Sequence, residues 1–140
     1  MSYCRAVRRI AGFVAVTLLL SSCSNVPSPA RTRVLLVGFW EAPTESEGHH
    51  HRKQAEFRPD GTYYGKTLGR LPERGGDRTF TGSWAIDGSD LLYLKTTSSD
   101  GVLQSVDIRD RLIRVSKDSF TYTNRFGETG TYTRIASLSP

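Results

Sequence analysis

Apolar and polar residues alternate in short runs through most of the chain. The run 34–41, VLLVGFWE, is rich in β-branched and aromatic residues. In the run 78–86, Phe80, Trp84 and Ile86 share one parity and therefore one face of an extended chain. Alternation with a period of two is typical of a strand with one buried face. These runs predict strands, and no helical periodicity follows residue 23.

Turn residues separate the runs. Pro59-Asp60-Gly61 is the clearest case, because proline presets φ, aspartate bonds its own backbone and glycine accepts positive φ. The flanking residues 52–58 and 62–64 then form a hairpin. The run 102–115 is long for one strand. We expect a bulge or a short break near Asp110 and Arg111 that brings Ile113 and Val115 into the core.

The segments add up to about eight short strands with turns every eight to twelve residues, which predicts an all-β domain built as one antiparallel up-and-down barrel. We assign this domain to residues 34–135 and a polar tail to 136–140. Residues 42–48 are predicted as a loop, and residues 69–77 as a long mobile loop.

The start of the chain has a different pattern. Arg5, Arg8 and Arg9 precede an apolar run at 10–20, interrupted by a glycine and a threonine. That run is far shorter than the ~20 residues of a membrane-spanning helix. A basic segment followed by a short apolar one is typical of a secretory signal peptide.

Leu20-Ser21-Ser22-Cys23 follows this run and resembles the lipobox of bacterial lipoproteins. The resemblance implies that residues 1–22 are cleaved as a signal peptide and that Cys23 receives a diacylglyceryl group. It further implies acylation, for example with palmitate, of the new amino terminus and anchorage to membrane lipid. The alternatives are an ordinary secretory signal with a chance cysteine, or an uncleaved anchor.

Residues 23–33 are small and polar with two prolines, which predicts a flexible linker behind the lipidated cysteine. Ser24 stands where an aspartate tends to retain Gram-negative lipoproteins at the inner membrane. The expected location is therefore membrane-anchored, facing the periplasm or the exterior, and on the outer membrane if the cell is Gram-negative.

Charge and cysteine content narrow the function. The net charge is +5, and the three arginines of the signal segment account for three of these charges, leaving +2. We therefore expect no nucleic-acid partner. Cys4 and Cys23 are the two cysteines. With one cleaved and one lipidated, the domain has no disulfide, no thiolate metal site and no cysteine nucleophile.

Gly38-Phe39-Trp40 matches the G-x-W at the start of lipocalin-type barrels, and the chain resembles small bacterial lipocalin-like domains over residues 34–135. Further matching segments are 60–63 (DGTY), 82–86 (GSWAI) and Tyr132 with Arg134. The resemblance implies that Trp40 closes the barrel floor and that Arg134 stacks over it. This would be a cation–π contact.

Aromatic residues supply the candidate ligand site. If the barrel is open inside, we expect an apolar cavity lined by four residues: Phe57, Tyr63, Trp84 and Tyr122. The alternative is an interior filled by side chains.

The candidates for catalysis and metal binding are weak. His49, His50 and His51 are consecutive, so their side chains alternate between faces and a polar loop is the favoured interpretation over a surface metal site. Asp107, Asp110 and Asp118 alternate with basic residues, as on a solvated face. We therefore expect no metal, no cofactor and no enzyme activity.

Two functions from different classes remain. The first is a non-enzymatic lipocalin-like domain that binds a small apolar ligand or lipid. The alternative is a protein-interaction module, an inhibitor or accessory subunit of an envelope enzyme or assembly machine. It would use either its outer surface or the loops 42–51 and 69–77.

The lipobox leads to a direct prediction. Cys23→Ala should abolish labelling by a radioactive or alkyne-bearing fatty acid and release the protein from the membrane fraction, because the thiol is the acceptor of the lipid. Cys4→Ala is the matched control and should leave both unchanged. Labelling that persists in Cys23→Ala would refute the lipobox interpretation.

Overall fold

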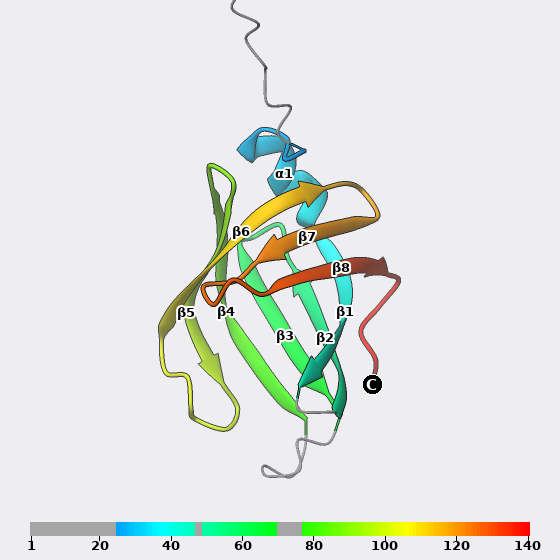
Figure 1. Ribbon diagram of the computed structural model, residues 1–140. Coiled ribbons are helices and arrows are strands. Elements are labelled where there is room, and N and C mark those ends of the chain that lie inside the picture. Colours follow the sequence, from blue (N-terminus) through cyan, green and yellow to red (C-terminus); the bar gives the residue numbers. More distant parts are fainter. Residues whose placement is uncertain (1–24, 47–48, 70–76) are drawn as a thin grey trace, which may run out of the picture.

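The computed structural model describes residues 25–46, 49–69 and 77–140, with side chains at 44–50 left out. The predicted signal peptide, Cys23 and most of the predicted loop 69–77 lie outside this part of the chain. Within it, one short helix precedes eight strands (Figure 1). The elements are α1 (Pro29–Leu36), β1 (Gly38–Ser46), β2 (His49–Phe57), β3 (Thr62–Leu68), β4 (Arg78–Asp87), β5 (Asp90–Ser98), β6 (Val106–Val115), β7 (Ser119–Thr123) and β8 (Thr129–Ile135).

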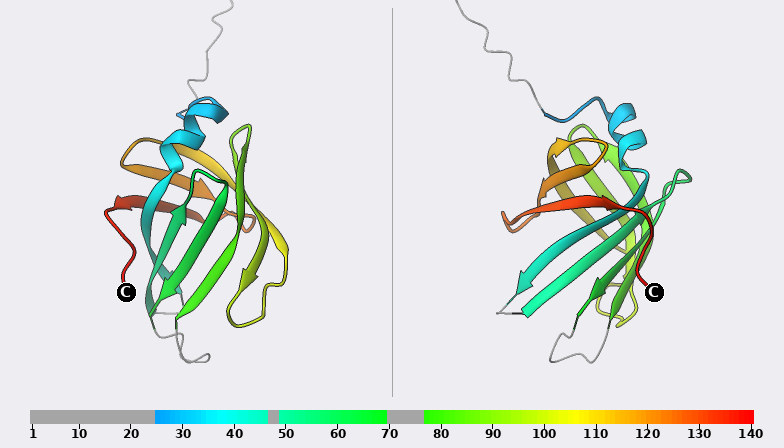
Figure 2. Two further views of the ribbon diagram at one scale, coloured as in Figure 1. Left: turned by 180° about the vertical axis from the view of Figure 1, so that it is seen from behind. Right: turned by 90° about the vertical axis from the view of Figure 1, so that its right-hand side faces the viewer.

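The strands form a closed barrel in which each pairs with the next along the chain. All pairs are antiparallel, and β1 completes the ring by pairing with β8 through Trp40 opposite Arg134 and one residue on either side. The views in Figure 2 show α1 lying at one end of this barrel. The predicted fold class, an antiparallel up-and-down barrel of eight strands, is confirmed.

The turn chemistry behaves as predicted at Asp60-Gly61. The Asp60 carboxylate accepts hydrogen bonds from the Thr62 backbone amide at 2.8 Å and from its hydroxyl at 2.7 Å. Gly61 has a φ of 86°, which a residue with a side chain rarely adopts. The β2–β3 hairpin therefore follows from local sequence alone.

The first strand begins later than the sequence predicts. Residues 29–36, divided between the predicted linker and the predicted strand, form α1, and β1 starts at Gly38. Pro29 occupies the first helical turn, where its missing N–H costs nothing. Leu36 and Thr32 are fully buried. A helix of two turns is stabilised by packing of this kind, so its sequence carries no clear periodic signal.

The predicted loop at 42–48 is also wrong in part. β1 continues through Pro43 to Ser46, and β2 begins at His49, so the three histidines lie on a strand. Pro43 is tolerated because β1 pairs with β8 only around Trp40, which leaves the outer part of β1 with one free edge. His51 is buried, with 4% of its surface exposed.

The expected irregularity of β6 lies slightly further along the chain. The register with β7 shifts between Leu112 and Arg114, so that Ile113 is the extra residue. Val115 is buried as predicted, but Ile113 is 45% exposed. Asp110 precedes the bulge and shares its parity with Leu112, so it is buried where the sequence predicted a solvated acid.

Aromatic side chains fill the end of the barrel beneath α1. The Trp40 and Phe120 rings meet edge to face at 5.0 Å between centroids, and Phe57 packs against Trp84 at 5.2 Å. Tyr132 stacks on Phe120 at 4.9 Å. Four of these aromatic residues have at most 2% of their surface exposed, and we call them the aromatic plug: Trp40, Phe57, Trp84 and Phe120.

Arg134 covers this plug from the outside. Its guanidinium carbon lies 4.1 Å from the centre of the Trp40 ring, the contact that the resemblance implied. It also donates hydrogen bonds to three backbone oxygens, those of Leu35, Val37 and Lys117. The Trp40 indole N–H donates to the Leu36 oxygen at 2.7 Å. One pair of side chains thus joins α1, β1, β8 and the β6–β7 turn.

We predict that Arg134→Met lowers the free energy of unfolding by about 2–3 kcal/mol, because three charge-assisted hydrogen bonds and a cation–π contact are lost. Arg134→Lys should retain only a minor part of this stabilisation, because a lysine ammonium lacks the planar guanidinium that reaches all three backbone oxygens. Urea denaturation, monitored by tryptophan fluorescence, measures the stability of both variants. Arg111→Met, at an exposed position, is the control, and equal losses in the control and Arg134→Met would contradict this account.

Candidate functional site

A cavity of about 410 Å³ occupies the barrel on the side away from α1. Its lining comes from the ends of strands that point away from the helix, including Thr67 on β3, Arg78 on β4 and Val106 on β6. The turn between β7 and β8 contributes Phe126. The barrel is therefore filled at one end by the aromatic plug and hollow at the other.

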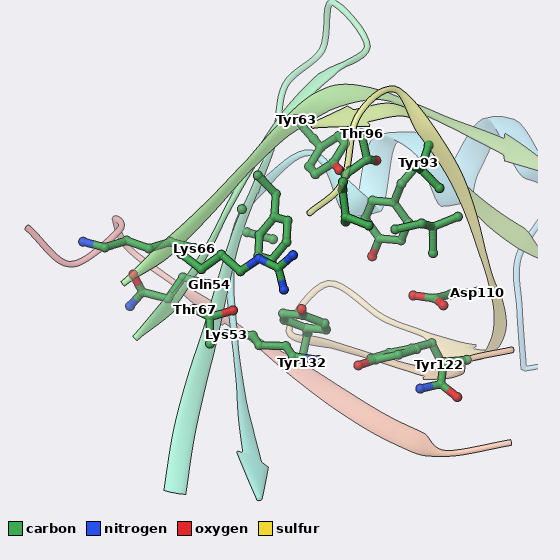
Figure 3. Close-up of a pocket in the computed structure, with 18 of the residues that line it drawn as sticks. Lys53, Gln54, Tyr63, Lys66, Thr67, Tyr93, Thr96, Asp110, Tyr122 and Tyr132 are labelled. Carbon is green, nitrogen blue, oxygen red and sulfur yellow. Dashed lines mark hydrogen bonds between the residues drawn. The ribbon is translucent and has the colours of Figure 1, made fainter. Parts of the chain in front are cut away.

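Four tyrosines from four different strands line this cavity. Figure 3 shows Tyr63, Tyr93, Tyr122 and Tyr132 around a common space. Tyr63 and Tyr93 meet edge to face at 5.1 Å, and Tyr122 lies 5.7 Å from Tyr132 between ring centres. The Tyr63 hydroxyl is hydrogen-bonded to the Thr96 hydroxyl at 2.6 Å. The wall thus combines flat apolar surface with hydroxyl groups.

Burial determines the ionisation of these phenols. It raises the pKa of all four tyrosines above the ordinary value, most strongly at Tyr93 and Tyr132, where neighbouring phenols and Asp110 add to the effect. The phenols are therefore neutral at physiological pH, and each can both donate and accept a hydrogen bond.

Asp110 is the acid of the cavity. Only 7% of its surface is exposed, and its carboxyl points into the space between the tyrosines (Figure 3). Burial raises its pKa from 3.8 to about 6, and the positive charge of Lys53 opposes that rise. Within the described ranges, the carboxyl has no hydrogen bond or ion pair of its own.

Four basic residues also line the cavity, and they differ in how their charge is compensated. Arg78 pairs with Asp100 at 2.8 Å, and Lys66 lies 3.6 Å from Asp77. Arg125 is exposed and stacks on Phe126 at 4.7 Å. Lys53, on β2, forms no ion pair with any described residue. The surroundings of the cavity therefore carry net positive charge.

The four predicted ligand-binding residues divide into two groups. Tyr63 and Tyr122 line the cavity. Phe57 and Trp84 belong to the aromatic plug, and the Trp84 indole N–H donates to the Arg58 backbone oxygen at 2.9 Å. The sequence placed all four on inward faces but did not indicate at which end of the barrel each lies.

Sequence reasoning missed four residues of the site: Lys53, Tyr93, Asp110 and Tyr132. A usable signal existed for Asp110, which shares its parity with Val106, Ile108 and Leu112. The alternating charges around it masked that signal, because Asp107 and Asp118 do lie on the exposed side.

The remaining predictions on chemistry concern metals and membranes. The side chains of His49 and His50 lie outside the described part, and no cluster of three metal-binding side chains occurs among the residues described. Within the same ranges, no helix combines the length and hydropathy needed to cross a bilayer. The lipidation of Cys23 stays a prediction, because that residue is outside these ranges.

Comparison with known proteins gives the fold alone. No protein-family model matches the chain, and no curated protein sequence is similar to it. Among solved structures, a redesigned β-barrel matches with a TM-score of 0.50 and 23% sequence identity, over 78% of this chain and 99% of that chain. At this identity, the similarity carries no information about function.

The raised pKa of Asp110 predicts a pH-dependent stability. The folded protein holds the proton of this carboxyl more tightly than the unfolded chain does. Protonated Asp110 therefore contributes to the free energy of unfolding below about pH 4, and this contribution is lost as the pH rises through about 6. Among the described residues, the ionisable groups that interact with this carboxyl are Lys53, Tyr93, Tyr122 and Tyr132. Asp110→Asn should therefore be more stable than the wild type by about 3 kcal/mol at neutral pH, and equal to it in acid.

Urea denaturation between about pH 4 and pH 8 measures this difference. Asp118→Asn, at a carboxyl with 75% of the side chain exposed, is the control and should follow the wild type throughout. Stability profiles of Asp110→Asn and wild type that stay parallel would show that the carboxyl does not titrate as described.

Proposed function

We propose that this chain is an envelope lipoprotein, anchored through Cys23, whose lipocalin-like barrel binds a small, partly apolar molecule without changing it chemically. The observation that carries the proposal is the cavity of about 410 Å³ at one end of a barrel whose other end is filled. Binding sites for small molecules typically have volumes of about 300–1,000 Å³ and combine apolar walls with a few polar groups.

The composition of the wall supports a binding role. Phe80, Val106 and Ile108 offer apolar surface, and the four tyrosine rings add more. The tyrosine hydroxyls and the Asp110 carboxyl supply directional contacts that orient a ligand. Burial of apolar ligand surface would provide most of the affinity, and these polar groups most of the selectivity.

The arrangement favours binding over catalysis. Asp110 is the one carboxyl among the described residues of the cavity wall, and no histidine accompanies it there. General acid–base chemistry on a bound molecule ordinarily needs a second titrating group or a nucleophile within hydrogen-bonding reach. The neutral phenols do not supply one near physiological pH.

The position of the cavity is compatible with an anchored protein. α1 immediately precedes β1 and lies at the filled end of the barrel, so the chain that leads back to Cys23 leaves from that end. The hollow end is the opposite one. A protein tethered at its amino terminus would therefore keep the cavity clear of the membrane, where a molecule in the surrounding fluid can enter it.

A cavity-filling variant tests the proposal. Val106→Phe should fill part of the cavity and remove small molecules that co-purify with the wild-type protein, as measured by native mass spectrometry. Val34→Phe adds the same volume on α1, where Val34 is 74% exposed, and should keep the bound molecules.

If the wild type carries no small molecule while pull-downs recover one envelope protein specifically, the interaction-module hypothesis replaces this one. A bound molecule that Val106→Phe retains fully would place the ligand elsewhere on the surface.

A further inference from the structure

Two opposite charges face the same cavity from different strands. Lys53 shares its parity on β2 with the inward residues Ala55 and Phe57. Asp110 shares its parity on β6 with Ile108 and Leu112. Ionisable residues are rare at inward positions of a small barrel, because transferring a charge out of water is costly unless it is paired. The presence of one of each sign therefore requires an explanation.

The two charges do not neutralise each other directly. No ion pair joins them, although the positive charge of Lys53 lowers the pKa of Asp110 and so acts across the cavity. Figure 3 shows Lys53 and Tyr132 on one side of the space and Asp110 with Tyr122 on the other. The carboxyl and the ammonium thus form two separate poles of one cavity, and tyrosine rings contribute to the same wall.

The other charged residues of the cavity are already compensated or turned to solvent. Arg78 pairs with Asp100, and Lys66 both pairs with Asp77 and donates to the Pro140 backbone oxygen at 2.9 Å. Arg125 is exposed. Within the described part of the chain, Lys53 and Asp110 are the charges of the wall that a bound molecule would have to satisfy.

The groups around Asp110 indicate which charged group of a ligand would bind there. A carboxylate accepts hydrogen bonds from an ammonium, and the neighbouring Tyr93 and Tyr122 rings can face a cation with their negative π-surfaces. Lys53 offers the opposite chemistry, since its ammonium is a donor to carboxylate or phosphate oxygens. A molecule with only one charge would leave the other pole without a partner from the ligand.

We propose that the ligand of this barrel is a small zwitterion, whose ammonium pairs with Asp110 and whose anionic group pairs with Lys53 across an apolar body that contacts the tyrosines. This inference rests on the proposed function, since it names the ligand class of the same cavity. The positive charge around the cavity also favours entry with the anionic group toward the basic residues.

A set of probes related in size separates the contributions of the two charges. We would titrate the full-length protein in phosphatidylcholine nanodiscs with γ-aminobutyrate, ε-aminocaproate, hexylamine, hexanoate and hexanol, and obtain Kd values from amide chemical shifts. At least one of the two amino acids should bind about tenfold more tightly than hexanol, because only a zwitterion satisfies both poles.

Variants then assign each pole. Asp110→Asn should weaken binding of the preferred amino acid and of hexylamine by about tenfold and leave hexanoate unchanged or improved. Lys53→Met should weaken the amino acid and hexanoate and spare hexylamine. Asp118→Asn and Lys117→Met carry the same changes at side chains that are 75% and 83% exposed, and they should leave all five affinities unchanged.

Each contrary result is informative. If hexanol or hexanoate binds as tightly as both amino acids, and Asp110→Asn has no effect, the inference of a zwitterionic ligand is overturned. The cavity would then still be a binding site. Equal losses for all five probes in both variants would show that Lys53 and Asp110 act only through the fold, which overturns the inference as well. If none of the probes binds, the inference fails, and the co-purified molecules in the Val106→Phe experiment decide the proposed function separately.

Discussion

The contact between Trp40 and Arg134 is the constraint on which the rest of the barrel depends. An antiparallel sheet closes only if its first and last strands meet in register, and here they pair at just three positions around these two residues. The indole N–H and the guanidinium together bind four backbone oxygens at the end of the barrel. Gly38, with φ of 129°, turns the chain from α1 into β1 beneath that guanidinium, and a side chain there would collide with it.

Closure at this end leaves a cavity at the other end. The aromatic plug fills the barrel beneath α1, and the core cluster continues from it to Tyr63 and Tyr132 in the cavity wall. The cavity accommodates groups that a continuous apolar core would exclude, namely a carboxyl and an amine. The aromatic plug and the cavity thus lie at opposite ends of one barrel. This division explains how a small domain can hold a cavity without losing its fold.

The errors of sequence interpretation share a physical origin. The strand count and the Asp60-Gly61 turn depend on neighbours along the chain, and both agree with the structure. α1 was missed because a helix of two turns exists only through the burial of Leu36 against the barrel. The extension of β1 through Pro43 was missed because only the incomplete β1–β8 ladder leaves a free edge there. Each depends on residues distant in sequence.

The sequence by itself therefore determined an up-and-down antiparallel barrel, because alternation and turn chemistry act over a few residues. It also contained the parity that directs Tyr63, Tyr122 and Asp110 inward. Only the tertiary structure decided which inward residues form the plug and which line the cavity, since that division depends on where α1 and Arg134 close the barrel. It likewise brought Lys53 and Asp110, from β2 and β6, to one cavity, because the curvature of a closed sheet places distant strands face to face.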